Sequence, residues 1–182
     1  MKTKSISAIL AAGAMAIAST TVAQAADTSE LNFSCQVREG VPTTIAQSVD
    51  SGAELPIFYW QAEALAGRTA DTPDELCNDV SQKLADLSVD YDLSNVNFIG
   101  THQINTDIPM ICANVGGQEC SSVLFTLKKD PKAAVVAGDV VDAILAKNLQ
   151  PEKKEFRTRG VQSISYQVNF WSLLGLKFSN KY

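Results

Sequence analysis

The chain has 182 residues, a formal net charge of −5 at pH 7 and a single histidine. An acidic balance argues against nucleic acid as a partner, because phosphate binding requires a basic face. The length fits one domain with a real hydrophobic core, and no low-complexity linker divides the chain.

The N-terminus has the organisation of a secretory signal peptide. Lys2 and Lys4 precede an apolar segment from Ile6 to Ile17, and Ala23-Gln24-Ala25 forms an A-x-A site. The apolar segment is shorter than the ~20 residues that cross a bilayer, so we expect removal of residues 1–25 rather than anchoring. The sequence therefore predicts an exported protein, secreted to a periplasm or bound peripherally to a membrane.

All four cysteines lie after residue 25. An oxidising compartment favours two disulfide bonds. A metal site is not expected, because the chain lacks a C-x2-C spacing, and no cofactor motif is present. Four cysteines allow three pairings.

The first half of the chain predicts three strands and a helix. Residues 31–37 alternate between apolar and polar, and residues 41–49 and 55–61 are further candidate strands. Residues 55–61 include Phe58, Tyr59 and Trp60, and Trp60 is expected to be a core or groove-wall residue rather than a platform for a ligand. Thr72 can cap a helix that starts at Pro73, with Glu75 completing a capping box. Four apolar residues at helical spacing then share one face: Cys77, Val80, Leu84 and Leu87.

A second set of three strands follows. The expected strands cover residues 96–104 and 108–113 and a segment in which Val123, Phe125 and Leu127 alternate. Cys112 and Cys120 are symmetric about Gly116, and facing residues of an antiparallel pair lie about 5 Å apart at Cα, within disulfide range. If these two pair, Cys35 must pair with Cys77. The chain-entropy model assigns a stabilisation of roughly 2.5 kcal/mol to the bond that closes the short loop, Cys112–Cys120, and about 4 kcal/mol to the bond that closes the long loop, Cys35–Cys77.

A second helix is expected after Asp130-Pro131 and before Pro151. Gly138 weakens this helix by up to ~1 kcal/mol. Its apolar stripe is Val136, Val140, Val141, Ile144, Leu145 and Leu149. The prediction is an α+β fold over residues 26–150: an antiparallel sheet in βββα-βββα order, with helices packed on one face and two disulfides as staples.

Several of these segments together resemble the circadian oscillating protein family of cyanobacteria. The segments are Phe33-Ser34-Cys35, residues 42–46, residues 56–60, Thr72-Pro73 leading to Cys77, Ile111-Cys112, and Cys120 with residues 124–127. The resemblance covers roughly residues 31–149 and includes all four cysteines. It implies an exported or membrane-associated protein whose expression follows a daily rhythm, with the thylakoid lumen as another compatible location. It implies no reaction and no catalytic residues.

Residues 151–182 form a basic tail that departs from the family pattern. Residues 26–150 carry a net charge of −11, whereas residues 151–182 carry +4. Ile164, Tyr166, Val168 and Phe170 alternate with polar residues, which predicts a half-buried strand. Three arrangements are open. The strand docks on the sheet, the tail anchors in a membrane interface, or the acidic body folds back on the basic tail. The candidate contacts with a membrane or partner are Trp171, Leu173, Leu174, Leu176, Phe178, Lys153, Lys154, Arg157 and Arg159.

Other groups of polar residues give weaker indications of a functional site. His102 is expected to be a strand histidine with a satisfied hydrogen bond, although a Ser-His-Asp or Cys-His site would require it. Asp90 and Asp92 mimic the start of a calcium loop, but Asn95 stands where an EF-hand needs glycine. A solvated acidic face is predicted from Glu63, Asp71, Asp74, Glu75 and Asp79.

The functional prediction is a non-enzymatic exported protein that associates peripherally with a membrane surface or with a membrane protein of the envelope or thylakoid. One alternative is a small periplasmic hydrolase with His102 as general base. The other is a soluble ligand-binding module built on Phe58, Tyr59 and Trp60.

Overall fold

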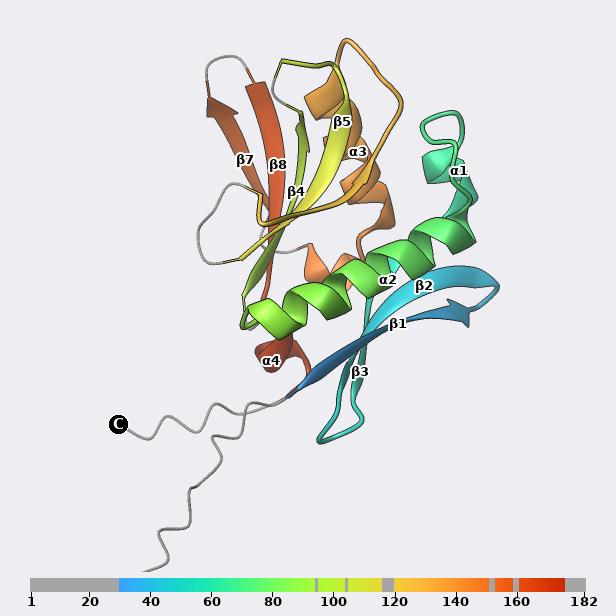
Figure 1. The fold of residues 1–182 in the computed structure, drawn as a ribbon, viewed down its shortest axis with the longest axis vertical. Helices are drawn as coiled ribbons and strands as arrows, with labels where there is room; N and C mark the ends of the chain where they lie inside the picture. The colour runs from blue at the N-terminus through green and yellow to red at the C-terminus, as the bar shows by residue number, and fades with distance from the viewer. Residues whose placement is uncertain are drawn as a thin grey trace, which may run out of the picture.

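Two antiparallel sheets and the helices packed against them make up the fold (Figure 1). The computed structural model describes residues 30–93, 95–103, 105–115, 120–150, 153–158 and 161–175, so the predicted signal peptide lies outside the described residues. One sheet has the order β1-β2-β3 and the other the order β6-β5-β4-β8-β7. The strands are β1 (Leu31–Arg38), β2 (Val41–Ser48), β3 (Glu54–Tyr59), β4 (Val96–His102), β5 (Pro109–Asn114), β6 (Ser122–Thr126), β7 (Lys153–Thr158) and β8 (Val161–Val168). The helices are α1 (Ala62–Leu65), α2 (Pro73–Asp90), α3 (Ala133–Ile144), the 3-10 turn η1 (Lys147–Leu149) and α4 (Phe170–Leu173).

The predicted α+β class and both predicted disulfides are confirmed. Cys35 is bonded to Cys77 and Cys112 to Cys120. The strands form two sheets, however, and two further strands follow α3. α2 packs on β1 and β2, whereas α3 packs on β4, β5 and β8.

A tight hairpin joins β1 to β2. Its two turn residues, Glu39 and Gly40, have φ values of 53° and 82°, and Arg38 faces Val41 across the turn. Positive φ at both positions is the geometry whose twist matches that of the flanking strands. This turn sets the register of the pair, and Cys35 therefore faces Thr44.

The capping box at the start of α2 is present as predicted. Thr72 accepts a hydrogen bond from the backbone N–H of Glu75, and the Glu75 carboxylate accepts from the backbone N–H of Thr72 at 2.8 Å and from its hydroxyl at 2.9 Å. The helix then buries the predicted face, which is Cys77, Val80, Leu84 and Leu87, together with Leu76 and Ser81. Cys77 consequently points toward β1.

The capping box makes the stability of α2 depend on pH. Hydrogen bonds from the backbone N–H and then the hydroxyl of Thr72 hold the pKa of Glu75 below its usual value of 4.5. A carboxyl whose pKa is lowered by folding stabilises the protein above its unfolded pKa, and this contribution is lost as the pH falls through the folded pKa. We expect Glu75→Gln to be less stable than the wild type at pH 7 and the difference to shrink below about pH 4.5. Urea denaturation at pH 7 and pH 3 measures this; a difference that is unchanged at pH 3 contradicts it. Thr72→Ala, which removes the cap itself, is expected to lose about 1 kcal/mol at pH 7.

Two predicted strand faces differ from the structure. Val37 is 66% exposed although it follows the alternation of Leu31, Phe33 and Cys35, because it lies next to the hairpin turn. In β6 the register shifts so that Phe125 faces Ile111 while Val123 faces Cys112. Leu124 is the extra residue of this bulge and is buried, whereas Val123 is 41% exposed. A bulge reverses the alternation, which a period of two cannot predict.

The C-terminal segment is part of the five-stranded sheet. β8 lies between β4 and β7, with Val168 opposite Val96 and Tyr166 opposite Phe98. The apolar residues of the predicted alternation, Ile164, Tyr166 and Val168, are buried as predicted, but Ser165 on the opposite face is also buried, at 6% exposure. β8 thus completes the face of the sheet on which α3 packs.

The second predicted helix starts and ends differently. Asp130 accepts a hydrogen bond from the backbone N–H of Lys132 at 2.7 Å and so forms a turn before α3, whose N-cap Lys132 makes no side-chain cap. The helix ends at Ile144 rather than continuing to Leu149. Leu145 instead pairs with Phe58 of β3, and Ala146 donates its N–H to Ile57 at 2.8 Å. A tertiary contact thus ends the helix before the apolar stripe is complete.

Two glycines allow α3 to lie close to the sheet. A Cβ on Gly100 of β4 would come within 2.7 Å of the backbone carbon of Ala137, and a Cβ on Gly138 would come within 2.7 Å of Cδ1 of Ile164. The backbone of α3 therefore rests directly on β4, and the branched end of Ile164 from β8 fills the space that Gly138 leaves. Gly138, predicted to weaken the helix, also has this packing role.

Substituting these two glycines is expected to have unequal effects. Gly100→Ala places a methyl group against backbone atoms that cannot move alone, so we expect a loss of about 3 kcal/mol in the free energy of unfolding. For Gly138→Ala the three nearest atoms all belong to the side chain of Ile164, with Cδ1 at 2.7 Å, Cγ1 at 3.1 Å and Cβ at 3.5 Å. The substitution also gains up to ~1 kcal/mol of helix propensity, so its net effect is expected to stay below about 1 kcal/mol. Chemical denaturation of the two variants measures the difference, and Ile164→Val should make Gly138→Ala more favourable. Equal losses for both glycines would contradict the close contact at Gly100.

Candidate functional site

The edge of the five-stranded sheet formed by β7 carries three of the predicted contact residues. β7 pairs with β8 so that Lys153 faces Tyr166, Lys154 faces Ser165 and Arg157 faces Gln162. β7 is the last strand in the sheet order. We call Lys153, Lys154 and Arg157 the basic edge. The strand has three basic residues and one acidic residue, a net charge of +2.

The other predicted contact residues differ in their exposure. Leu173 in α4 is 42% exposed, which leaves it accessible, and Trp171 lies in the same short helix. Leu174 is only 8% exposed and belongs to the core, so its assignment to a membrane contact is corrected. The helical spacing from buried Phe170 to Leu174 is the signal that predicts this. Arg159, Leu176 and Phe178 lie outside the described residues.

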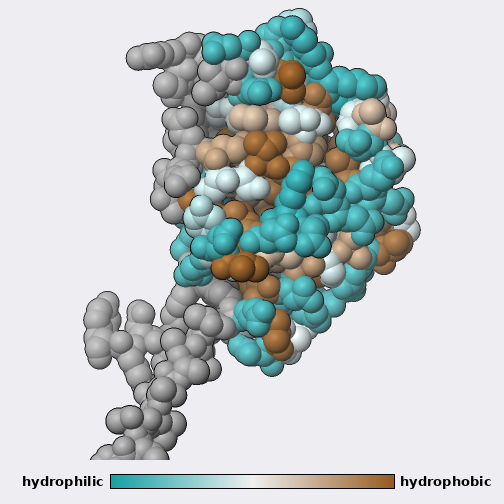
Figure 2. All heavy atoms as spheres, viewed as in Figure 1, coloured by the Kyte–Doolittle hydropathy of each residue, from teal (hydrophilic) through white to brown (hydrophobic). Residues whose placement is uncertain are grey.

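The predicted acidic face gathers mainly on α2, which contacts β1, β2 and β6. α2 has five acidic residues and one lysine, a net charge of −4, and Figure 2 shows hydrophilic side chains along it. Lys83 pairs with Asp79 at 2.7 Å and donates to the backbone carbonyl of Leu124 in β6 at 2.7 Å. β6 and β7 are the two opposite edges of the sheet. The acidic helix therefore borders one edge, and the basic residues occupy the other.

The aromatic cluster lies in the core. Phe58 and Trp60 are 0% and 1% exposed, and their rings contact Phe98 and Phe125 at centroid distances of 4.9 Å and 5.3 Å respectively. Only Tyr59 of the three predicted residues is partly exposed. The core interpretation of Trp60 is confirmed, and these rings do not form a surface platform for a ligand.

His102 ends β4, as predicted for a strand histidine. Its Nδ1 is buried and has no hydrogen-bond partner in the described part of the chain, so the predicted satisfied hydrogen bond is absent at that atom. No described hydroxyl, thiol or carboxylate is paired with it to form a triad. Likewise, among the described residues no three His, Cys, Asp or Glu side chains lie close enough to hold a metal ion.

Two hydroxyl residues that the sequence did not single out surround the Cys35–Cys77 disulfide. Thr44 accepts hydrogen bonds from Nε1 of Trp60 at 2.9 Å and from Oγ of Ser81 at 3.3 Å, and its own Oγ1 lies 3.9 Å from Sγ of Cys77. Local signals exist for both residues. A two-residue turn at Glu39-Gly40 places position 44 opposite position 35, and Ser81 follows Cys77 by one helical turn.

In the ranges that the structure describes, no helix is long and apolar enough to cross a membrane. No curated protein and no solved structure matches the chain. A family model described as circadian oscillating protein COP23 matches residues 32–174. This match extends beyond residue 149, where the resemblance was expected to end, and takes in β7, β8 and α4. It spans more than half of the chain and both disulfides, and the chain therefore belongs to the circadian oscillating protein COP23 family.

Proposed function

We propose that this is a non-enzymatic exported protein that associates peripherally with a membrane surface through the basic edge. The observation that supports the proposal best is the separation of charge along the five-stranded sheet, with the basic edge at β7 and the acidic α2 beside β6. The chain as a whole is acidic, so attraction to an anionic surface requires this separation and orients the molecule with β7 toward the lipid.

Export is supported by the signal-peptide pattern of residues 1–25 and by the four paired cysteines. Disulfides persist in oxidising compartments and are rare where thiols are kept reduced. The signal-peptide pattern and the disulfides both agree with a location in a periplasm or on a membrane that faces an oxidising compartment.

Each basic residue close to an anionic bilayer contributes about 1 kcal/mol of attraction at physiological ionic strength. The basic edge and Arg159 together are thus expected to contribute a few kcal/mol, which is enough for reversible binding and too little for permanent anchoring. Exposed Leu173 adds an apolar side chain on α4. Membrane binding of this kind is weakened by salt.

The test is vesicle flotation of residues 26–182. One variant replaces Lys153, Lys154, Arg157 and Arg159 with Gln, and a matched variant replaces Lys128, Lys129, Lys132 and Lys147 with Gln. Both variants change the net charge equally, but only the first removes charge from the basic edge. We expect the wild type and the matched variant to float with vesicles containing phosphatidylglycerol, and the first variant to lose at least about tenfold in affinity.

Salt and lipid composition provide the controls. Binding is expected to disappear with phosphatidylcholine vesicles and to weaken at 0.5 M salt, where the screening length is about 4 Å. Equal flotation of the two variants would refute the role of the basic edge. Binding to native membranes without binding to lipid vesicles would instead identify a membrane protein as the partner.

A further inference from the structure

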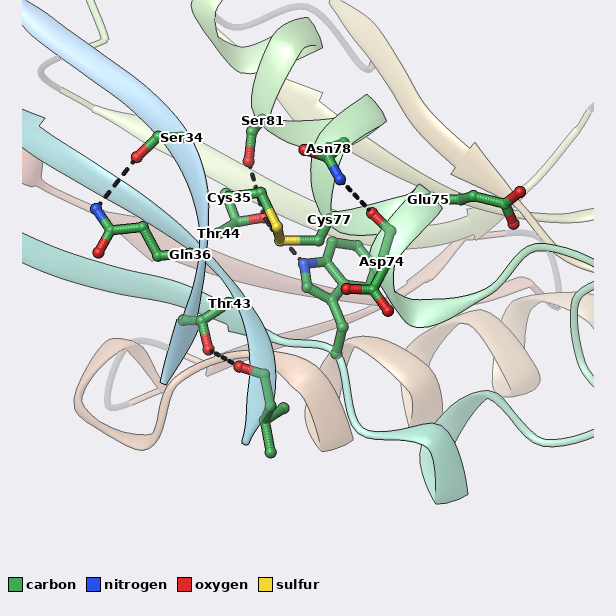
Figure 3. The surroundings of a disulfide bond; sticks show 12 residues. Ser34, Cys35, Gln36, Thr43, Thr44, Asp74, Glu75, Cys77, Asn78 and Ser81 are labelled. Carbon is green, nitrogen blue, oxygen red and sulfur yellow. Dashed lines mark hydrogen bonds between the residues drawn. A yellow bond between two sulfur atoms is a disulfide. The ribbon is translucent and has the colours of Figure 1, made fainter. Parts of the chain in front are cut away.

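The Cys35–Cys77 disulfide joins two elements that differ in exposure (Figure 3). Cys77 lies on the inner face of α2 and is 0% exposed. Cys35 is only partly buried and lies on β1, an edge strand of the three-stranded sheet. Of the two cysteines, Cys35 is therefore the one that an incoming group can reach more easily.

The hydrogen bonds around Thr44 direct its proton toward Cys77. A hydroxyl group has one proton and accepts at two positions. Nε1 of Trp60 and Oγ of Ser81 occupy both acceptor positions of Thr44 Oγ1, at 2.9 Å and 3.3 Å. Its proton is thus left for Sγ of Cys77 at 3.9 Å, and Figure 3 shows Thr44 and Ser81 beside the sulfur atoms.

This arrangement stabilises one product of disulfide cleavage. Sulfur in a disulfide accepts hydrogen bonds weakly, whereas a thiolate is charged and accepts them strongly. A stabilised thiolate leaves faster in thiol–disulfide exchange. Because Thr44 is fixed by Trp60 and Ser81, the stabilising donor is in place before the bond breaks.

We propose that Cys35–Cys77 is a site of thiol–disulfide exchange with a protein dithiol, in which Cys35 is attacked and Cys77 leaves. The thiolate of the partner forms a bond to Sγ of Cys35, the bond between Cys35 and Cys77 breaks, and its electron pair goes to Sγ of Cys77. The second thiol of the partner then attacks the mixed disulfide and releases Cys35. The disulfide gains two electrons and two protons, and the partner dithiol becomes a disulfide. Reduction removes the covalent link between α2 and β1.

The experiment uses the oxidised chain of residues 26–182 and thioredoxin with its reductase and NADPH. A thioredoxin variant that lacks its second active-site cysteine traps the mixed disulfide, and peptide mapping by mass spectrometry is expected to find it on Cys35. Thr44→Val is expected to slow reduction of Cys35–Cys77 about tenfold, because the thiolate loses its donor. Thr44→Ser restores a hydroxyl and should recover most of the rate. Reduction of Cys112–Cys120 serves as the internal control and should not change.

The direction of the effect separates this role from a structural one. Thr44→Val also leaves Nε1 of Trp60 without a partner, and any local loosening exposes the disulfide and speeds its reduction. A slower reaction therefore reports the lost donor. Reduction of Thr44→Val that is as fast as or faster than that of the wild type would overturn the proposal. A mixed disulfide on Cys77, or none, would also overturn it, and this mapping needs no variant of the chain.

Discussion

Truncation after Gln150 is expected to abolish cooperative folding. Among the described residues of the removed segment, five apolar side chains are buried: Ile164, Tyr166, Val168, Phe170 and Leu174. Burying a large apolar side chain contributes about 1.5–3 kcal/mol, so the loss is on the order of 10 kcal/mol. This is comparable with the whole stability of a typical domain. Thermal melts followed by circular dichroism measure the effect, and the truncated chain should lack a sigmoidal transition.

The physical reason is the position of β8. Its removal leaves β4 without one neighbour and uncovers Phe98, and the ring of Phe170 no longer contacts Phe33 at 5.9 Å. A chain that ends after Gly175 keeps β8 and α4 and is the matched control, with an expected melting temperature close to that of the full chain. A cooperative melt of residues 26–150 would contradict the placement of β8. Vesicle flotation of residues 26–150 would report the loss of folding rather than the loss of membrane binding. Charge substitutions are therefore preferred as the test of membrane binding.

Removing the Cys35–Cys77 disulfide is expected to destabilise the protein more than removing Cys112–Cys120. The two bonds span sequence separations of 42 and 8 residues. The chain-entropy model then predicts losses of about 4 kcal/mol for Cys35→Ala with Cys77→Ala and about 2.5 kcal/mol for Cys112→Ala with Cys120→Ala. Denaturation in guanidinium chloride under non-reducing conditions measures both.

Burial does not separate the two bonds. Cys77 and Cys112 are both 0% exposed, so truncation to alanine leaves unfilled space in either variant, and loop length carries the expected difference. The wild type under reducing conditions gives a comparison without substitution. An equal or larger loss for the Cys112–Cys120 pair would show that loop length does not decide the contribution of each bond.

Local signals predicted a large part of this fold. The start of α2 depends on Thr72, Pro73 and Glu75, which interact within one turn, and the structure has the capping box that they predict. The burial of Ile164, Tyr166 and Val168 also agrees with their alternation. The end of α3 was not predictable in this way, because it depends on Leu145 pairing with Phe58, a residue 87 positions earlier.

The candidate site was predicted only in part. The sequence identified the basic residues of β7, but not that they occupy the edge of the sheet opposite the acidic α2. It identified Leu174 as a contact, whereas packing places it in the core. The role of Thr44 depends on a hydrogen bond from Trp60 and a contact with Cys77, which come from different elements.

The sequence alone indicated most of the strands and the start of α2, and it indicated the disulfide pairs on the condition that Cys112 pairs with Cys120, because capping, turn geometry and alternation act between residues a few positions apart. The tertiary structure decided the division into two sheets, the insertion of β8 between β4 and β7, and the close approach of α3 to Gly100. Those features depend on which surfaces pack together when the chain closes, and residues far apart in the sequence carry no local mark of that choice.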